Sequence, residues 1–265
     1  MDTPDIAPVA LTSGDPSGVG PELAVRAWET LGDTLPFFLI GDPAHLPTGT
    51  PVAEISDPSQ APAAARAGLP VLPHSFAAPA TPGQPVPANA PGVVEVIRRA
   101  VTLVQTGAAS AICTAPISKL ELKRHAGFTY PGHTEFLAHQ GGVDHVVMML
   151  AAAELRVVPA TIHIPLADVA GALTPETLEA TIRLTHAALI RDFGVPAPRL
   201  AVAGLNPHAG EGGTIGTEEQ RFIGPLCQRL RDEGLDVLGP LSADTMFHDT
   251  ARATYDAAIA MYHDQ

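Results

Sequence analysis

The chain has 265 residues, 46% of them hydrophobic and 16% charged, with a net charge of -13. This composition fits a globular protein with a sizeable core, and the acidic balance argues against nucleic acid as a partner, because that role requires a basic face. Two cysteines cannot build a disulfide framework. The N-terminus lacks the basic start of a signal peptide, and no apolar run approaches the roughly 18 residues of a membrane helix. We therefore expect a cytoplasmic protein that does not enter a membrane.

Short apolar runs bounded by turn residues alternate with amphipathic stretches along the chain. Such runs predict strands buried on both faces, and their alternation with helices is typical of a parallel sheet covered on both sides. The predicted strands are Val9–Leu11, Phe37–Ile40, Ala111–Cys113, Val146–Leu150, Val157–Ile164, Leu200–Ala203 and Ala257–Met261. An α/β fold built from βαβ units follows.

Amphipathic segments predict helices between these strands. The first runs over Glu22–Leu31 and the second from about Val93 to Gln105. The clearest signal begins at Thr174, an N-cap residue followed by proline and an acidic residue, and Gly194 supplies the stop. A further helix is expected from about Thr217 to Arg231.

The segment from Asp42 to Asn89 is rich in proline and alanine and has few periodic positions. It predicts loops with one short strand near Val71. Such a segment can join two lobes, and a two-lobed α/β molecule with a ligand cleft between its lobes is the most economical architecture. We expect residues 1–265 to form one two-lobed catalytic unit.

A glycine-rich turn, Ser13–Glu22, joins the first predicted strand to the first helix. Glycines at such a turn let the backbone approach a ligand, and the helix start favours anions. The turn lacks the lysine of a P-loop and does not match the dinucleotide fingerprint. A binding loop and a tight turn that needs glycine are about equally consistent with it.

Three histidines, His163, His208 and His263, follow apolar runs at predicted strand ends. Ligands in open α/β sheets gather beyond the carboxyl ends of strands, so three imidazoles placed there can converge. They would leave a divalent metal with its full charge and open positions, as a catalytic site requires. On residue types alone, a metal site and three separate structural histidines remain equally consistent.

Four further residues are candidates for binding or proton transfer. His133 and Thr134 join a turn to a helix start, where an imidazole and a hydroxyl can hold a phosphate or carboxylate. Asp264 is beside His263, and Asp244 lies in the segment Ser242–Thr245. A carboxylate can orient a metal-bound histidine or take a proton, although Asp244 can equally cap a helix.

Six sequence blocks run in order from one end of the chain to the other. They are Gly14–Glu22, Thr114–Lys119, Tyr130–Phe136, His163–Leu166, Gly204–Glu211 and Met261–Gln265. Together they resemble the 4-hydroxythreonine-4-phosphate dehydrogenase family of the pyridoxal phosphate pathway. The resemblance implies an α/β/α fold akin to that of isocitrate and isopropylmalate dehydrogenases, with a mostly parallel sheet. It also implies a homodimer whose metal site is shared between subunits.

The resemblance assigns roles to the candidate residues. It implies a divalent metal, zinc, cobalt or magnesium, on His163, His208 and His263, and substrate contacts at His133 and Thr134. Cofactor-binding residues are not assigned by it.

The implied reaction is an oxidation of 4-hydroxythreonine-4-phosphate with NAD or NADP, followed by loss of carbon dioxide to give 3-amino-2-oxopropyl phosphate. The metal would lower the pKa of the substrate hydroxyl while hydride passes to the nicotinamide ring. Asp244 and Asp264 match family positions near the reacting centre, and we expect Asp264 to handle the proton or orient a ligand.

The chain departs from the family pattern at its C-terminus. The family continues past the last block with a lysine, an asparagine and an arginine that hold the substrate, so we expect this part of the family fold to be missing here. Three alternatives remain: a sister dehydrogenase for a threonate or erythronate phosphate, a truncated chain with impaired catalysis, and a metal-dependent hydrolase that uses the same histidines.

Overall fold

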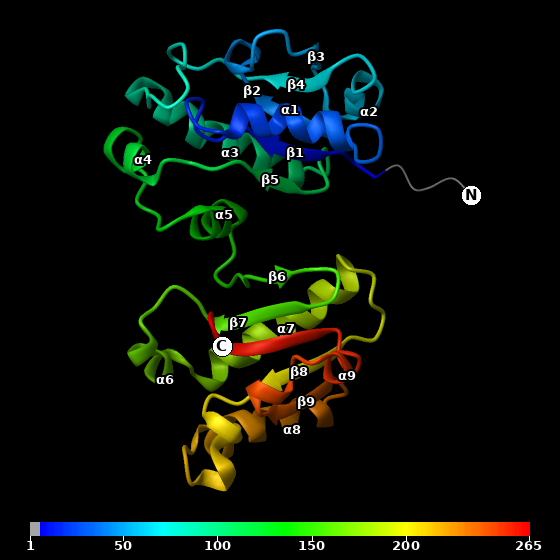
Figure 1. Ribbon diagram of the computed structural model, residues 1–265, viewed down its shortest axis with the longest axis vertical. Helices are drawn as coiled ribbons and strands as arrows, with labels where there is room; N and C mark the ends of the chain where they lie inside the picture. Colours follow the sequence, from blue (N-terminus) through cyan, green and yellow to red (C-terminus); the bar gives the residue numbers. More distant parts are fainter. Residues whose placement is uncertain (1–5) are drawn as a thin grey trace, which may run out of the picture. The chain divides into compact units, whose positions relative to one another are not determined.

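The computed structural model describes residues 6–265, so the acidic N-terminus, Met1–Asp5, lies outside the described residues. The chain divides into two compact units, Met1–Val143 and Asp144–Gln265 (Figure 1). Each unit contains one five-stranded sheet with helices packed on it. The α/β class with mostly parallel strands is therefore confirmed. No helix within residues 6–265 is long and apolar enough to cross a membrane.

The first unit contains a parallel sheet in the order β3-β4-β2-β1-β5. The strands are β1 (Val9–Thr12), β2 (Phe37–Gly41), β3 (Val52–Glu54), β4 (Leu69–Pro73) and β5 (Ile112–Thr114). Every residue of the central strand β2 is buried, as its continuous apolar sequence predicts.

Helices cover both faces of this first sheet. Alternate residues of β2 point to opposite faces and so contact different helices. Phe37 and Leu39 pack in the cluster that contains the small residues of α1 (Gly20–Leu31), whereas Phe38 and Ile40 pack against α3 (Ala90–Gln105). The remaining helices are α2 (Ala61–Ala64), α4 (Lys119–His125), α5 (His133–Gly141) and the 3-10 turns Pro43–His45, Pro58–Gln60 and Pro87–Asn89.

The region from Asp42 to Asn89 has more regular structure than its composition predicts. The expected strand near Val71 is β4, but β3 is also present and the short helix α2 lies between them. β3 has only three residues and lies at the sheet edge, so no periodic pattern announces it.

The second unit contains a sheet in the order β6-β7-β10-β8-β9. The strands are β6 (Leu150–Ala151), β7 (Arg156–Thr161), β8 (Arg199–Ala203), β9 (Asp236–Leu241) and β10 (Ala257–Tyr262). Only β6 runs antiparallel to its neighbour among these described strands. The predicted strand Val146–Leu150 is wrong over most of its length, because Val146 and Leu150 are exposed and the paired segment begins at Leu150.

Both faces of the second sheet are also covered. Leu200 and Val202 pack in the cluster formed with α7 (Pro175–Arg191) and α8 (Gly224–Asp232), whereas Ala201 and Ala203 pack with Met246 and Tyr255. The other elements are α6 (Val169–Ala172), α9 (Asp249–Arg252) and the short turns Leu166–Asp168, Pro207–Gly213 and Ala243–Thr245.

The predicted helix over Thr217–Arg231 forms in two parts. Its first turn, Glu219–Ile223, is a π-helix, and α8 begins only at Gly224. Pro225, at the second position of α8, has no N–H to donate, so the α-helical ladder cannot run unbroken through this point. The π turn fixes the place of Glu219, which is buried.

Candidate active site

The three predicted metal histidines follow neighbouring strands of the second unit. His163 lies two residues after β7, His263 directly follows β10, and His208 is in the turn after β8. β10 pairs in parallel with β7 on one side and with β8 on the other, so all three strands end at the same sheet edge. Parallel pairing therefore explains why residues so distant in the sequence lie at one edge.

His163 and His263 form a close pair. Their ring centroids are 5.8 Å apart and the rings are tilted by 35°. Nδ1 of His263 lies 2.8 Å from Oδ1 of Asp264. When Nδ1 carries the proton and donates it to this carboxylate, Nε2 is left as an acceptor or metal ligand.

The histidine pair lines a hollow of about 440 Å³. The side chains around it are largely apolar apart from the two imidazoles, the Tyr262 phenol and the Asp264 carboxylate. They are Ile162, His163, Ile164, Leu166, Val169, Tyr262, His263 and Asp264. The structure thus brings together three of the predicted site residues.

His208 lies in a second hollow of about 330 Å³, together with Asp244, Ser242 and Gln265. The hydroxyl of Ser242 donates to Oδ1 of Asp244 over 2.6 Å. This hydrogen bond, and then the nearby His208, lower the pKa of Asp244. Tyr262 lines this hollow as well as the first.

Asp244 does not cap a helix. It lies inside the turn Ala243–Thr245, whose N-cap residue is Ser242. The capping alternative is therefore wrong, and the carboxylate is exposed beside His208.

The imidazole and carboxylate groups at this sheet edge are suitable ligands for a divalent metal, but they do not form a complete cluster. Within residues 6–265 no group of three or more His, Cys, Asp or Glu side chains is arranged to hold a metal ion. His163 and His263 are adjacent, and Asp264 supplies the hydrogen bond that commonly orients a metal-bound imidazole. The three-histidine metal site remains a prediction.

His133 and Thr134 belong to the first unit, where they begin α5. Gly132 precedes them as an N-cap without a side-chain cap. Nε2 of His133 is buried and has no hydrogen-bond partner within residues 6–265. Burial, and then the positive charge of Lys119, lower the pKa of His133.

Lys119 is a candidate site residue that sequence reasoning missed. It begins α4, and a Cβ added at Gly132 would lie 3.5 Å from its Nζ. The ammonium group therefore lies beside the start of α5, where a positive charge and free N–H groups favour an anion. Its only sequence signal was its place at the end of the block Thr114–Lys119.

The glycine-rich turn is explained by close backbone packing. Gly14 has a φ of 66°, and a Cβ there would lie 2.4 Å from the carbonyl oxygen of Pro116. A Cβ at Gly20 would lie 2.0 Å from the carbonyl oxygen of Ser13. These contacts are sufficient reason for glycine at both positions.

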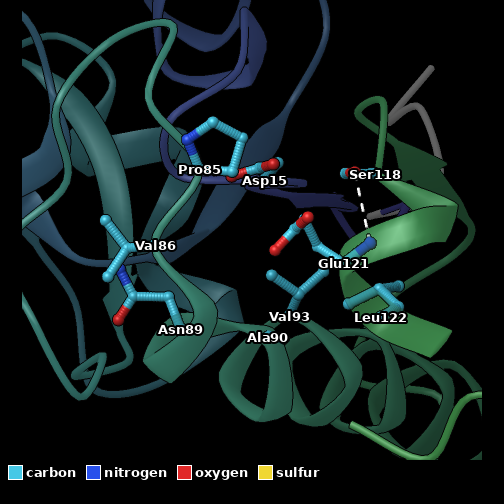
Figure 2. A pocket seen from close by; sticks show the side chains of 9 residues that line it. All are labelled: Asp15, Pro85, Val86, Asn89, Ala90, Val93, Ser118, Glu121 and Leu122. Carbon is cyan, nitrogen blue, oxygen red and sulfur yellow. Dashed lines mark hydrogen bonds between the residues drawn. The ribbon is translucent and has the colours of Figure 1, made fainter. Parts of the chain in front are cut away.

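A small hollow lies beside this turn. Figure 2 shows Asp15, from the turn, and Glu121, from α4, on the same hollow, together with Ser118. The backbone N–H of Glu121 donates to Oγ of Ser118, the N-cap residue of α4. The Asp15 carboxylate accepts the backbone N–H of Ser17 over 2.9 Å. The Asp15 carboxylate and the Ser118 hydroxyl therefore both stabilise their local turns.

Comparison with known proteins agrees with this architecture. Residues 35–265 match the family of pyridoxal phosphate biosynthetic protein PdxA. The chain is 59% identical to a 4-hydroxythreonine-4-phosphate dehydrogenase of Paracoccus denitrificans (strain Pd 1222), over 97% of this chain and 80% of that protein. It is 56% identical to the protein of the same name from Roseobacter denitrificans (strain ATCC 33942 / OCh 114), over 99% and 81%.

A solved structure gives the same result. The 4-hydroxythreonine-4-phosphate dehydrogenase of Klebsiella pneumoniae superposes with a TM-score of 0.88 at 34% identity, over 97% of this chain and 82% of that chain. Two mostly parallel sheets, with histidines beyond the strand ends of the second, together with these matches define an α/β oxidoreductase. The chain belongs to the PdxA family of pyridoxal phosphate biosynthesis, which confirms the family predicted from the six blocks.

Proposed function

We propose that this chain oxidises 4-hydroxythreonine-4-phosphate with NAD or NADP, and that the product loses carbon dioxide to give 3-amino-2-oxopropyl phosphate. The observation that carries the proposal is the His163–His263 pair with Asp264 at the sheet edge, in a chain 59% identical to a dehydrogenase of that name. The proposal includes one two-lobed catalytic unit over residues 1–265, a homodimer with a shared active site and a cytoplasmic location.

His163, His208 and His263 are the proposed ligands of a divalent metal. Imidazole nitrogens suit zinc or cobalt better than magnesium. When bound, the metal would supply the positive charge that lowers the pKa of the substrate hydroxyl, and the nicotinamide ring would accept the hydride.

Asp264 is the proposed proton-handling residue. Its carboxylate is exposed and lies on the histidine hollow, where Oδ1 is 2.8 Å from His263 Nδ1. It can hold the imidazole ring in one orientation and accept a proton at Oδ2. Asp244 suits this step less well, because it lies in the other hollow beside His208 and its carboxylate already accepts the Ser242 hydroxyl. Asp244 is better placed to keep a negative charge beside His208.

Phosphate binding is assigned to the start of α5, with His133, Thr134 and Lys119. The lowered pKa of His133 leaves its imidazole neutral near pH 7, so it can donate one hydrogen bond without a charge. Lys119 supplies the positive charge, and the first N–H groups of the helix supply further donors.

The test is nicotinamide reduction by the purified chain with 4-hydroxythreonine-4-phosphate. The protein is treated with a chelator and then given zinc, cobalt or magnesium, with NAD and NADP compared in parallel. We expect turnover that is lost with the chelator and restored by a metal. Threonate and erythronate 4-phosphates are run alongside.

Three results would count against the proposal. A higher kcat/KM for threonate or erythronate phosphate would assign the chain to the sister dehydrogenases. Absence of turnover by folded, metal-loaded protein would point to impaired catalysis, and phosphate release without nicotinamide reduction would point to a hydrolase.

A further inference from the structure

The turn that carries His208 has an unusual backbone. Five successive residues from His208 to Gly212 have φ between 43° and 79°. Three of them, His208, Ala209 and Glu211, are not glycine and so resist this left-handed conformation. Surrounding contacts must therefore hold the turn in place.

Glu219 makes the contacts that hold the start of this turn. Its Oε1 accepts the backbone N–H of Asn206 over 2.8 Å, and its Oε2 accepts the side-chain Nδ2 of Asn206 over 3.0 Å. Both carboxylate oxygens thus accept hydrogen bonds from Asn206, two positions before His208. Oε2 also lies 2.6 Å from where a Cβ on Gly210 would stand, so the carboxylate packs directly under the turn.

The carboxylate of Glu219 is buried without a counter-charge. The residue is 5% exposed, and no salt bridge to it occurs among residues 6–265. The neighbouring Glu218, in contrast, lies 3.8 Å from Arg221. Glu218 accepts a hydrogen bond from the side chain of Asn206 but not from its backbone N–H. Burying an unpaired carboxylate is costly, and hydrogen bonds alone offset that cost here. A buried carboxylate held only by hydrogen bonds, under the turn that carries His208, points to a role in the site.

We propose that Glu219 is a positioning residue for the active site: its buried carboxylate fixes Asn206 and thereby the left-handed turn that presents His208 to the hollow it shares with Asp244. The π turn Glu219–Ile223 places the carboxylate under the loop, as such turns often do at functional sites. The metal-binding role of His208 rests on the proposed function, whereas the dependence of the turn on Glu219 does not.

The first test compares Glu219→Gln and Glu219→Ala with the matched control Glu218→Gln. Amide hydrogen exchange is measured in metal-free protein over residues 204–214. We expect exchange at least about tenfold faster in Glu219→Ala, because two hydrogen bonds to a charged group are lost. Glu219→Gln keeps the volume and one carbonyl acceptor, so its effect is smaller. Glu218→Gln should stay within about twofold of wild type, because the backbone N–H of Asn206 keeps its partner.

The second test asks whether the turn matters for His208. Zinc binding by the same proteins is titrated without substrate or cofactor, and kcat and KM are measured separately. We expect about tenfold weaker zinc binding in Glu219→Ala. We also expect kcat to fall by a larger factor than the factor by which the KM for NAD changes.

Wild-type exchange over residues 204–214 in both Glu219 variants would overturn the proposal. A loosened turn with wild-type zinc affinity and kcat would overturn it as well. If Glu219→Ala does not fold, Glu219→Gln carries the comparison. A wild-type chain that neither binds zinc nor turns over substrate contradicts the proposed function alone, since the exchange data still decide the role of Glu219.

Discussion

At the scale of single residues, the candidate site depends on pairs that set each other's charge and orientation. Asp264 lies 2.8 Å from His263, and Asp244 lies beside His208 with a lowered pKa. Burial, and then the charge of Lys119, lower the pKa of His133 in the first unit. Each pair joins a residue that sequence reasoning singled out to a neighbour that lies close enough to orient it or to interact with its charge. The chemistry can therefore be tested one side chain at a time.

Asp264→Asn is the sharpest of these changes. The amide cannot take a proton and accepts a weaker hydrogen bond from His263, so kcat with 4-hydroxythreonine-4-phosphate should fall about 100-fold or more. The fold should not change, since the Asp264 side chain is 92% exposed. Steady-state kinetics and thermal melting measure the two effects, with Asp33→Asn in the first unit as the control. A kcat within about twofold of wild type would remove Asp264 from the proton-handling role.

Lys119→Met tests the anion site at the start of α5. Removing the positive charge should raise the pKa of His133 toward its ordinary value, because a like charge disfavours protonation. The KM for the phosphorylated substrate should rise about tenfold through loss of a charge-assisted contact. The pKa is followed by NMR titration of the imidazole.

The matched control for this change is Lys123→Met, since Lys123 lies on the same helix α4. It should leave both quantities unchanged. Equal effects of the two substitutions would show that the helix as a whole, and not the position of Lys119, controls the anion site.

At the scale of elements, an ion-pair network joins α7 to α8. Glu179 on α7 lies 2.6 Å from Arg229 on α8 and 2.8 Å from Arg183 on its own helix. Glu233 closes the network by pairing with both arginines. The hydrogen bonds from Arg229 and then Arg183 lower the pKa of Glu179 from 4.5 to about 2. The network supports the helices that cover one face of the second sheet.

Glu179→Gln should destabilise the second unit only modestly. The network is solvent-exposed, so we expect a loss of about 1 kcal/mol or less in the free energy of unfolding at neutral pH. Because folding lowers this pKa, the contribution is complete above the ordinary value of 4.5 and disappears as pH falls toward 2. Urea unfolding between pH 7 and pH 3 measures the difference between wild type and variant. A stability difference that grows as the pH falls would contradict this assignment. High salt should reduce the difference measured at neutral pH.

At the scale of the whole molecule, the sequence predicts most of the buried strands and the edge strand β5, but it misses the edge strands β3 and β9. Continuous apolar runs such as Phe37–Ile40 identify strands covered on both faces. β9 was missed because it contains Gly239 and Pro240, which an edge strand tolerates and a central strand does not. Edge strands carry weaker patterns, since packing constrains only part of their surface.

The same limit applies to the site. Histidines at strand ends can be found by pattern, and parallel pairing brings His163, His208 and His263 to one sheet edge. The strand order, with β10 between β7 and β8, cannot be read from local sequence, so the pattern alone left open whether His163 and His263 lie together, and only the family resemblance implied it. Glu219 and Lys119 were missed because a single buried carboxylate or lysine has no periodic signal.

Metal binding should stabilise the folded chain as a whole, because a ligand that binds only the native state shifts the unfolding equilibrium. Zinc at 100 times its Kd would add about 2.7 kcal/mol, which corresponds to a Tm increase of about 5–10 °C for a protein of this size. A chelator should reverse the increase. His163→Ala with His263→Ala should abolish it, whereas His145→Ala, in an exposed loop position, should retain it. Scanning calorimetry with and without zinc measures the wild type, the double variant and His145→Ala. An equal shift in the double variant would place the zinc elsewhere in the chain and contradict the assignment of these two histidines.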